Sequence, residues 1–173
     1  LWDPKSAKEA FLKASQIAHG AKRQVALTLS DAFCVDRYRD EFLHLMRSRA
    51  VDLIFANEVE LHSLYQTSSF DTALAQLRKD VALGVVTRSE KGCVIATTDD
   101  VTAVPACPIE RLVDATGAGD LFAAGFLFGL VGGASYENAG RLGALAAAEV
   151  IQHIGARPQV SLRELAQANG LTA

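Results

Sequence analysis

Short apolar segments alternate with longer amphipathic segments along this chain, and that order restricts the fold more than any other feature. Residues 25–29, residues 51–55 and Leu83–Thr87 are rich in Val, Leu and Ile, as is typical of buried strands. Segments with helical periodicity separate them. Parallel strands need such crossover connections, which place helices on both faces of the sheet. The sequence therefore predicts an α/β fold, a three-layer α/β/α sandwich with a mainly parallel, doubly wound sheet.

The same periodicity gives the expected helices and one hairpin. The predicted helices are residues 6–19, 38–46, 57–65 and 71–77, a helix that starts at Leu121, residues 137–154, and Leu162–Ala168. The first helix has its apolar side chains on one stripe, namely Ala7, Ala10, Phe11, Ala14 and Ile17. Cys93–Thr97 and Val101–Val104 predict a β-hairpin.

Composition excludes several classes of protein. The chain has 173 residues, 50% of them hydrophobic, which is enough for one sizeable core. The net charge of −3, with no basic stripe, argues against a nucleic-acid partner. No apolar run is long enough to span a bilayer and no secretion signal is visible, so we expect no membrane partner. The three cysteines, Cys34, Cys93 and Cys107, are widely spaced and indicate reduced thiols in the cytoplasm.

A Gly-rich turn, Asp114-Ala-Thr-Gly-Ala-Gly-Asp120, runs directly into a long apolar helix. Such a turn aims backbone N–H groups at one small volume, at the positive end of the helix dipole. We expect an anion hole there, formed by Gly117, Ala118, Gly119 and Asp120, with a positive φ at Gly119. The Asp120 carboxylate would repel a bound phosphate, so general-base work on an attacking hydroxyl is the role that fits it. The alternative is a helix N-terminus with Asp as a cap and glycines making the turn.

An N-x-x-E pattern follows the strand at residues 51–55. If a helix begins at Asn57, then Glu60 lies one turn later on the same side. Asn57 could donate to a phosphate oxygen, and Glu60 could hold Mg²⁺ through water. The alternative is a capping box, with Asn57 at the N-cap and Glu60 three residues on.

The segment from Asp114 to Asp120, with the small residues after it, resembles the C-terminal signature of the PfkB (ribokinase-like) family of sugar and nucleoside kinases. The resemblance implies ATP as phosphoryl donor, Mg²⁺, and a hydroxyl of a nucleoside or sugar as acceptor. The segment Thr87-Arg-Ser-Glu-Lys-Gly92 resembles the T-x-G-x-x-G nucleotide loop of the family, with Ser89 in place of the first glycine. It implies that Thr87, Ser89 and Gly92 bind ATP.

Residues 138–148 form a stretch with an unusually small-sided helical face, which predicts either close helix packing or room for a flat group. In the resembling family, small residues of this helix line the adenine pocket, which would place Gly143 and Ala144 against the base. The resemblance also implies a monovalent-cation site, such as one for K⁺, formed by backbone groups. Its expected residues are Asp114, Thr116, Val150, His153 and Gly155.

The resemblance covers nearly the whole chain but only the C-terminal half of the family's length. The chain does not begin with Met, and its single methionine is Met46. We therefore interpret residues 1–173 as the C-terminal portion of a single ribokinase-like kinase domain, without the N-terminal strands and lid. A homodimer is compatible with the full-length protein. Residues 27–36 resemble the adenosine kinase-like branch, which favours adenosine over ribose as acceptor.

Two rival functions remain at this point. One is a non-catalytic nucleotide-binding or regulatory module of the same fold, against which the presence of Asp120 argues. The other is a Rossmann oxidoreductase, but no strand of this sequence is followed by G-x-G-x-x-G.

Overall fold

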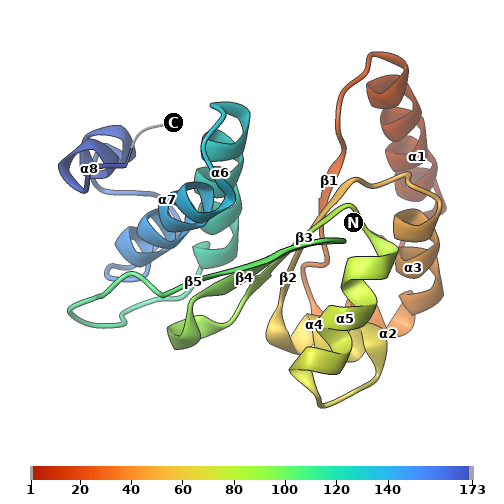
Figure 1. Ribbon diagram of the computed structural model, residues 1–173, viewed down its shortest axis with the longest axis horizontal. Coiled ribbons are helices and arrows are strands. Elements are labelled where there is room, and N and C mark those ends of the chain that lie inside the picture. The colour runs from red at the N-terminus through yellow and green to blue at the C-terminus, as the bar shows by residue number, and fades with distance from the viewer. Residues whose placement is uncertain (1, 172–173) are drawn as a thin grey trace. The chain divides into compact units, whose positions relative to one another are not determined.

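The computed structural model describes residues 2–171 (Figure 1). Its five strands form one sheet in the order β1-β2-β3-β4-β5. They are β1 (Ala26–Thr28), β2 (Leu53–Asn57), β3 (Leu83–Thr87), β4 (Cys93–Thr97) and β5 (Val101–Val104). β1 pairs with β2 in parallel, with Ala26 opposite Leu53 and Thr28 opposite Phe55. β4 and β5 are neighbours joined through residues 98–100, which is the expected hairpin. The sheet is mostly parallel and the α/β prediction is confirmed.

The chain forms two compact units. The first contains the residues up to Val86 together with Ala96–Asp100, and the second contains Thr87–Ile95 and the residues from Val101 onward. Within residues 2–171, no helix is both long enough and apolar enough to cross a membrane.

The first unit holds the helices of the N-terminal half. They are α1 (Lys5–Gly20), α2 (Ala32–Arg37), α3 (Arg39–Arg47), α4 (Glu58–Tyr65) and α5 (Phe70–Asp80). Residues 53–56 of β2 are all buried, as expected for a strand covered on both faces. They lie in or beside a core that includes Met46, Leu61, Leu64 and Leu77. The core positions β2 so that Asn57, its last residue, is exposed at the carboxyl end of the strand.

Helix α1 buries only part of its apolar stripe. Ala7 and Phe11 are half-buried, whereas Ala10, Ala14 and Ile17 are exposed. The buried residue of α1 is Ser15, whose hydroxyl donates to the carbonyl oxygen of Ala50 at 2.6 Å. This hydrogen bond ties α1 to the residues that precede β2.

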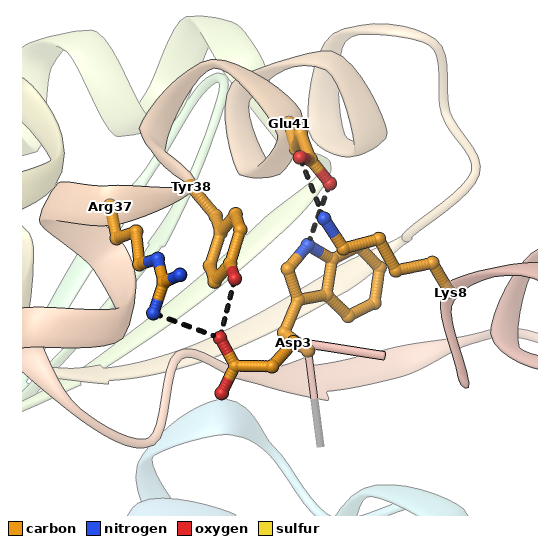
Figure 2. Close-up of polar contacts among 6 residues, drawn as sticks. Asp3, Lys8, Arg37, Tyr38 and Glu41 are labelled. Atoms are coloured by element: carbon orange, nitrogen blue, oxygen red, sulfur yellow. Dashed lines mark hydrogen bonds and ion pairs between the residues drawn. The ribbon is translucent and has the colours of Figure 1, made fainter. Parts of the chain in front are cut away.

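A cluster of polar and aromatic side chains ties the first residues of the chain to α2 and α3 (Figure 2). The cluster consists of Trp2, Asp3, Lys8, Arg37, Tyr38 and Glu41. Trp2 is buried, and its indole N–H donates to Glu41 at 2.9 Å, while Lys8 donates to the other oxygen of that carboxylate at 2.8 Å. The Lys8 ammonium lies 4.1 Å from the ring centre of Tyr38, a cation–π distance. Asp3 accepts a hydrogen bond from Tyr38.

The second unit is built around two closely packed helices, α6 (Ala118–Val131) and α7 (Tyr136–Val150), followed by α8 (Leu162–Ala168). A Cβ on Gly125 would lie 2.6 Å from the carbonyl oxygen of Leu142, closer than atoms can pack. Glycine at this position therefore allows the two backbones to approach. Helix α6 begins at Ala118 rather than at Leu121, and α7 ends at Val150 rather than at residue 154.

Candidate active site

The Gly-rich turn enters α6 through Gly117, the residue that precedes the helix. Gly117 has a φ of 82°, a left-handed conformation that favours glycine. A Cβ on Gly117 would also lie 2.7 Å from the Cβ of Ala156. The expectation of a positive φ at Gly119 is wrong, because Gly119 lies in the first turn of α6. Nothing stands within 4 Å of the place that a Cβ on Gly119 would take, so the space in front of this residue is open.

The start of α6 keeps backbone donors free. No side chain caps this end of the helix. The N–H of Ala118 donates to the carbonyl oxygen of Ala115 at 3.2 Å, which removes Ala118 from the donors expected in the anion hole. Within the described part of the chain, no oxygen accepts a hydrogen bond from the N–H groups of Gly119 and Asp120. Two open N–H groups at a helix N-terminus can bind an anion.

Asp120 itself lies in the first turn of α6 and its side chain is exposed. A carboxylate is favoured at the positive end of a helix dipole. Among residues 2–171 no side chain or backbone group is bonded to it. The carboxylate is therefore available to accept a proton from a ligand held at the neighbouring N–H groups.

Asp114 shapes the turn that precedes the helix. One carboxylate oxygen accepts from the N–H of Thr116 at 2.9 Å and the other from the N–H of Gly155 at 3.0 Å. The hydroxyl of Thr116 and the N–H groups of Gly155 and Thr116 lower the pKa of Asp114 to about 2. Asp114 therefore stays ionised at ordinary pH and links the Gly-rich turn to the segment after α7.

That segment contains the other residues expected at a monovalent-cation site. Val150 is the last residue of α7, and Gly155 has a φ of 97°. The ring Nε2 of His153 lies 3.2 Å from Oε1 of Glu149. Within the described residues, no group of three or more His, Cys, Asp and Glu side chains is placed to hold a metal ion. Any cation here would have to be held mainly by backbone carbonyl groups, as the resemblance implies.

The two residues expected against adenine have different surroundings. Ala144 lines a cavity of about 210 Å³, together with Pro105, Ala106, Cys107, Pro108, Arg141, Leu145, Asn169 and Leu171. Gly143 is buried, and its Cβ would lie 2.7 Å from the carbonyl oxygen of Phe122 in α6. Gly143 thus allows the close helix packing that the sequence analysis gave as one of two possibilities. Ala144 lies where a ligand could enter. An adenine contact at either residue stays a prediction.

The loop after β3 is held by Gly92. It contains η1, a short 3₁₀ helix (Ser89–Lys91). Gly92 has a φ of 85°, and a Cβ there would lie 2.0 Å from the carbonyl oxygen of Val104, so no other residue fits. Ser89, which replaces a glycine of the family pattern, has a φ of 52°, so it keeps a backbone conformation that glycine adopts more readily. Thr87 ends β3.

Asn57 and Glu60 belong to the first unit, where they form a complete capping box. Asn57 Oδ1 accepts from the N–H of Glu60 at 2.8 Å, and the Glu60 carboxylate accepts from the N–H and the side-chain amide of Asn57 at 2.9 and 2.8 Å. Glu60 is 5% exposed, and burial, with the charge of Asp31, raises its pKa. The local geometry is thus that of the capping alternative, and a magnesium role for Glu60 stays a prediction.

Sequence reasoning missed Glu149, whose carboxylate also accepts from the N–H of Gln159 at 2.8 Å. The available signal was the i,i+4 spacing of Glu149 and His153 at the end of an otherwise small-sided helix.

Comparisons with known proteins show the family and the fold. Residues 1–162 match the family model described as pfkB family carbohydrate kinase. A probable sugar kinase from Rhizobium etli CFN 42 is 53% identical, with a TM-score of 0.98 over 99% of this chain and 52% of its own. An adenosine kinase from Sinorhizobium meliloti is 52% identical, with a TM-score of 0.96 over 98% of this chain and 52% of its own.

A more distant structure supports the fold. Ribokinase from Arabidopsis thaliana is 23% identical and has a TM-score of 0.74 over 91% of this chain and 51% of its own. The chain spans about half the length of these solved relatives. It has a ribokinase-like fold and belongs to the pfkB family of carbohydrate kinases.

Proposed function

We propose that this chain is the C-terminal portion of a single ribokinase-like kinase domain, which transfers the terminal phosphoryl group of ATP to a hydroxyl of a nucleoside or sugar in the cytoplasm. The observation that carries the proposal is the start of α6. There the open N–H groups of Gly119 and Asp120 stand beside an unpartnered carboxylate. Phosphoryl transfer to an alcohol requires hydrogen-bond donors for the phosphoryl oxygens and a base for the hydroxyl proton, close to each other.

In the proposed reaction, the N–H groups of Gly119 and Asp120 receive the phosphoryl oxygens as negative charge spreads over them. The Asp120 carboxylate orients the acceptor hydroxyl and takes its proton. Because the transition state of phosphoryl transfer is loose, little base strength is needed, and a carboxylate can serve. Gly117 fixes the turn, so the donors are in place before the substrate binds.

The nucleotide would lie along the second unit. The cavity lined by Ala144 is smaller than pockets that enclose a whole drug-sized ligand, which are roughly 300–1,000 Å³, so it suits the base alone. The loop from Thr87 through Ser89 to Gly92 would contact the rest of the nucleotide. Gly143 would contribute indirectly, by allowing α7 to approach α6.

Mg²⁺ fits Glu60 only through water. Both carboxylate oxygens already accept a hydrogen bond from Asn57, so a direct metal bond would disturb the cap, whereas a water molecule can donate to a remaining lone pair. When bound, Mg²⁺ neutralises phosphate oxygens. In the full-length protein, Glu60→Gln should raise the Mg²⁺ concentration needed for half-maximal rate. An unchanged Mg²⁺ titration would leave Glu60 with the capping role alone.

The charge near the segment from Val150 to Gly155 suits a monovalent cation such as K⁺. The ionised Asp114 carboxylate accepts from the N–H of Gly155 and so brings a negative charge to this segment. We propose that Thr116, Val150, His153 and Gly155 contribute carbonyl oxygens to it.

The acceptor is proposed to be adenosine ahead of ribose. The S. meliloti relative is named an adenosine kinase, and the R. etli relative a probable sugar kinase, so both classes belong in the test. The experiment measures ADP release by the full-length protein with adenosine, with ribose and without acceptor. Acceptor-dependent release supports the proposal. Binding of ATP with no release under any of these conditions would favour the alternative, a non-catalytic nucleotide-binding module.

A further inference from the structure

Glu149 has a largely buried carboxylate near the end of α7 that the proposed reaction does not use. Its side chain is 9% exposed. Oxygen Oε1 accepts from the N–H of Gln159 at 2.8 Å and lies 3.2 Å from Nε2 of His153. Burying a carboxylate is costly, and here the two contacts close residues 150–159 back onto the helix.

The middle of the same segment contacts the Gly-rich turn. Gly155 donates to Asp114 at 3.0 Å. Ala156 stands directly against Gly117, whose Cβ, if it had one, would lie 2.7 Å from that of Ala156. Gly117 is the residue that precedes α6, so a shift of Ala156 would be transmitted to the start of the helix.

We propose that Glu149 is a positioning residue, which holds residues 150–159 against Gly117 and thereby fixes the donors of Gly119 and Asp120. The effect on turnover rests on the proposed function. The effect on the position of the turn concerns only the contacts within this chain and can be tested without any activity.

One feature of the contact supplies a conservative variant. Both polar contacts of Glu149 use Oε1, while Oε2 is buried and has no partner among the described residues. Replacing Oε2 by an amide nitrogen, as in Glu149→Gln, therefore keeps the oxygen that accepts from Gln159. Glu149→Ala removes both contacts. Glu137→Ala, an exposed position in the first turn of the same helix, is the matched control.

The first measurement is hydrogen exchange in the full-length protein. The reporters are N–H groups that the turn protects, namely Leu121, which donates to Gly117, and Thr116 and Gly155, which donate to Asp114. Glu149→Ala should speed exchange at these three by at least roughly tenfold, because local opening becomes easier. Glu149→Gln and Glu137→Ala should change it by less than about threefold. Unchanged exchange at Leu121 and Thr116 in Glu149→Ala would overturn the proposal.

The second measurement is kinetic. Glu149→Ala should lower kcat at least roughly tenfold with little change in KM for ATP, since the donors act mainly in the transition state, and Glu149→Gln should restore most of it. A raised KM with unchanged kcat would contradict a role at the catalytic turn. If the wild-type protein has no kinase activity, the proposed function fails, and the exchange experiment alone decides the role of Glu149.

A third variant covers the case in which Glu149→Ala does not fold. Ala156→Gly alters an exposed residue and removes only the methyl group that touches Gly117. It should speed exchange at Leu121 while leaving Gln159, bonded to Glu149, protected. Unaltered exchange at Leu121 would then count against the proposal.

Discussion

Gly117 and Gly119 belong to the same turn but differ in backbone conformation and surroundings. The left-handed φ belongs to Gly117, where Ala156 also fills the space of a side chain, while Gly119 is helical and faces open space. Sequence reasoning located the turn and assigned the wrong glycine, because the pattern G-A-G does not state at which residue the helix begins.

Gly117→Ala should therefore destabilise the full-length protein by about 1–3 kcal/mol, from backbone strain and contact with Ala156. Gly119→Ala is the matched control. It should cost no stability and gain up to about 1 kcal/mol of helix propensity. Denaturant midpoints of the two variants decide the matter. Equal losses of stability would show that the turn does not depend on Gly117 in particular.

Asp114 should make the fold sensitive to acid. Its pKa is lowered to about 2 in the folded protein from an ordinary 3.8, so the folded state binds this proton less readily than the unfolded state does. The stabilising contribution is present above pH 3.8 and is lost as the pH falls toward 2. Asp114→Asn should thus lower the melting temperature at neutral pH, and the difference from wild type should shrink between pH 4 and pH 2. A difference that is constant over this range would contradict the assignment.

At the scale of elements, the sequence predicts the strands better than the helix ends. β3, β4 and β5 begin and end at the predicted residues, as does α8, whereas β1 is shorter than residues 25–29 and β2 lies two residues later than residues 51–55. Helix α2 was not predicted, because six residues show no clear period. The start of α6 depends on the φ of Gly117, and periodicity carries no information about it.

Some residues of the candidate site could be located from the sequence and others could not. The turn before α6 could be located because its residues are consecutive, whereas Glu149 depends on a contact across ten residues of chain to Gln159. Asn57 and Glu60 were ambiguous for a physical reason. The same carboxylate and amide suit both a capping box and a hydrated metal ion, and only the first is made within the chain.

The packing of α6 on α7 gives a prediction at this scale. Gly143→Ala would bring a Cβ to 2.7 Å from the carbonyl oxygen of Phe122, which forces the helices apart. We expect a loss of about 1–3 kcal/mol in the free energy of unfolding. Gly20→Ala, where nothing stands within 4 Å of the new Cβ, serves as the control and should be neutral or slightly stabilising. An unchanged free energy of unfolding in Gly143→Ala would show that α6 and α7 can accommodate the added methyl group.

At the scale of the whole molecule, this chain is about half as long as its solved relatives. β1 is the end strand of the sheet, and Ala26 and Thr28 on it are exposed, although parallel strands are normally covered on both faces. Large apolar side chains such as Ile17, Phe33 and Val131 are also exposed. These surfaces favour the interpretation that further chain covers them in the full-length protein.

Residues 1–173 alone should consequently show no kinase activity and should aggregate, because an open strand edge and apolar faces are exposed. The residues that would orient the acceptor and exclude water are also expected outside this chain. Light scattering and ADP release with adenosine or ribose test this directly. Acceptor-dependent turnover by a monodisperse monomer would place the whole active site within these residues.

The central claim is that Asp120 acts as the base beside the two open N–H groups at the start of α6. The most direct test is Asp120→Asn in the full-length protein, with kcat and the Kd for ATP measured on the same preparation. Asn keeps the shape of the side chain and cannot take the proton, so kcat should fall at least roughly 10²-fold while the Kd for ATP changes little. Near-normal turnover in this variant would contradict the account.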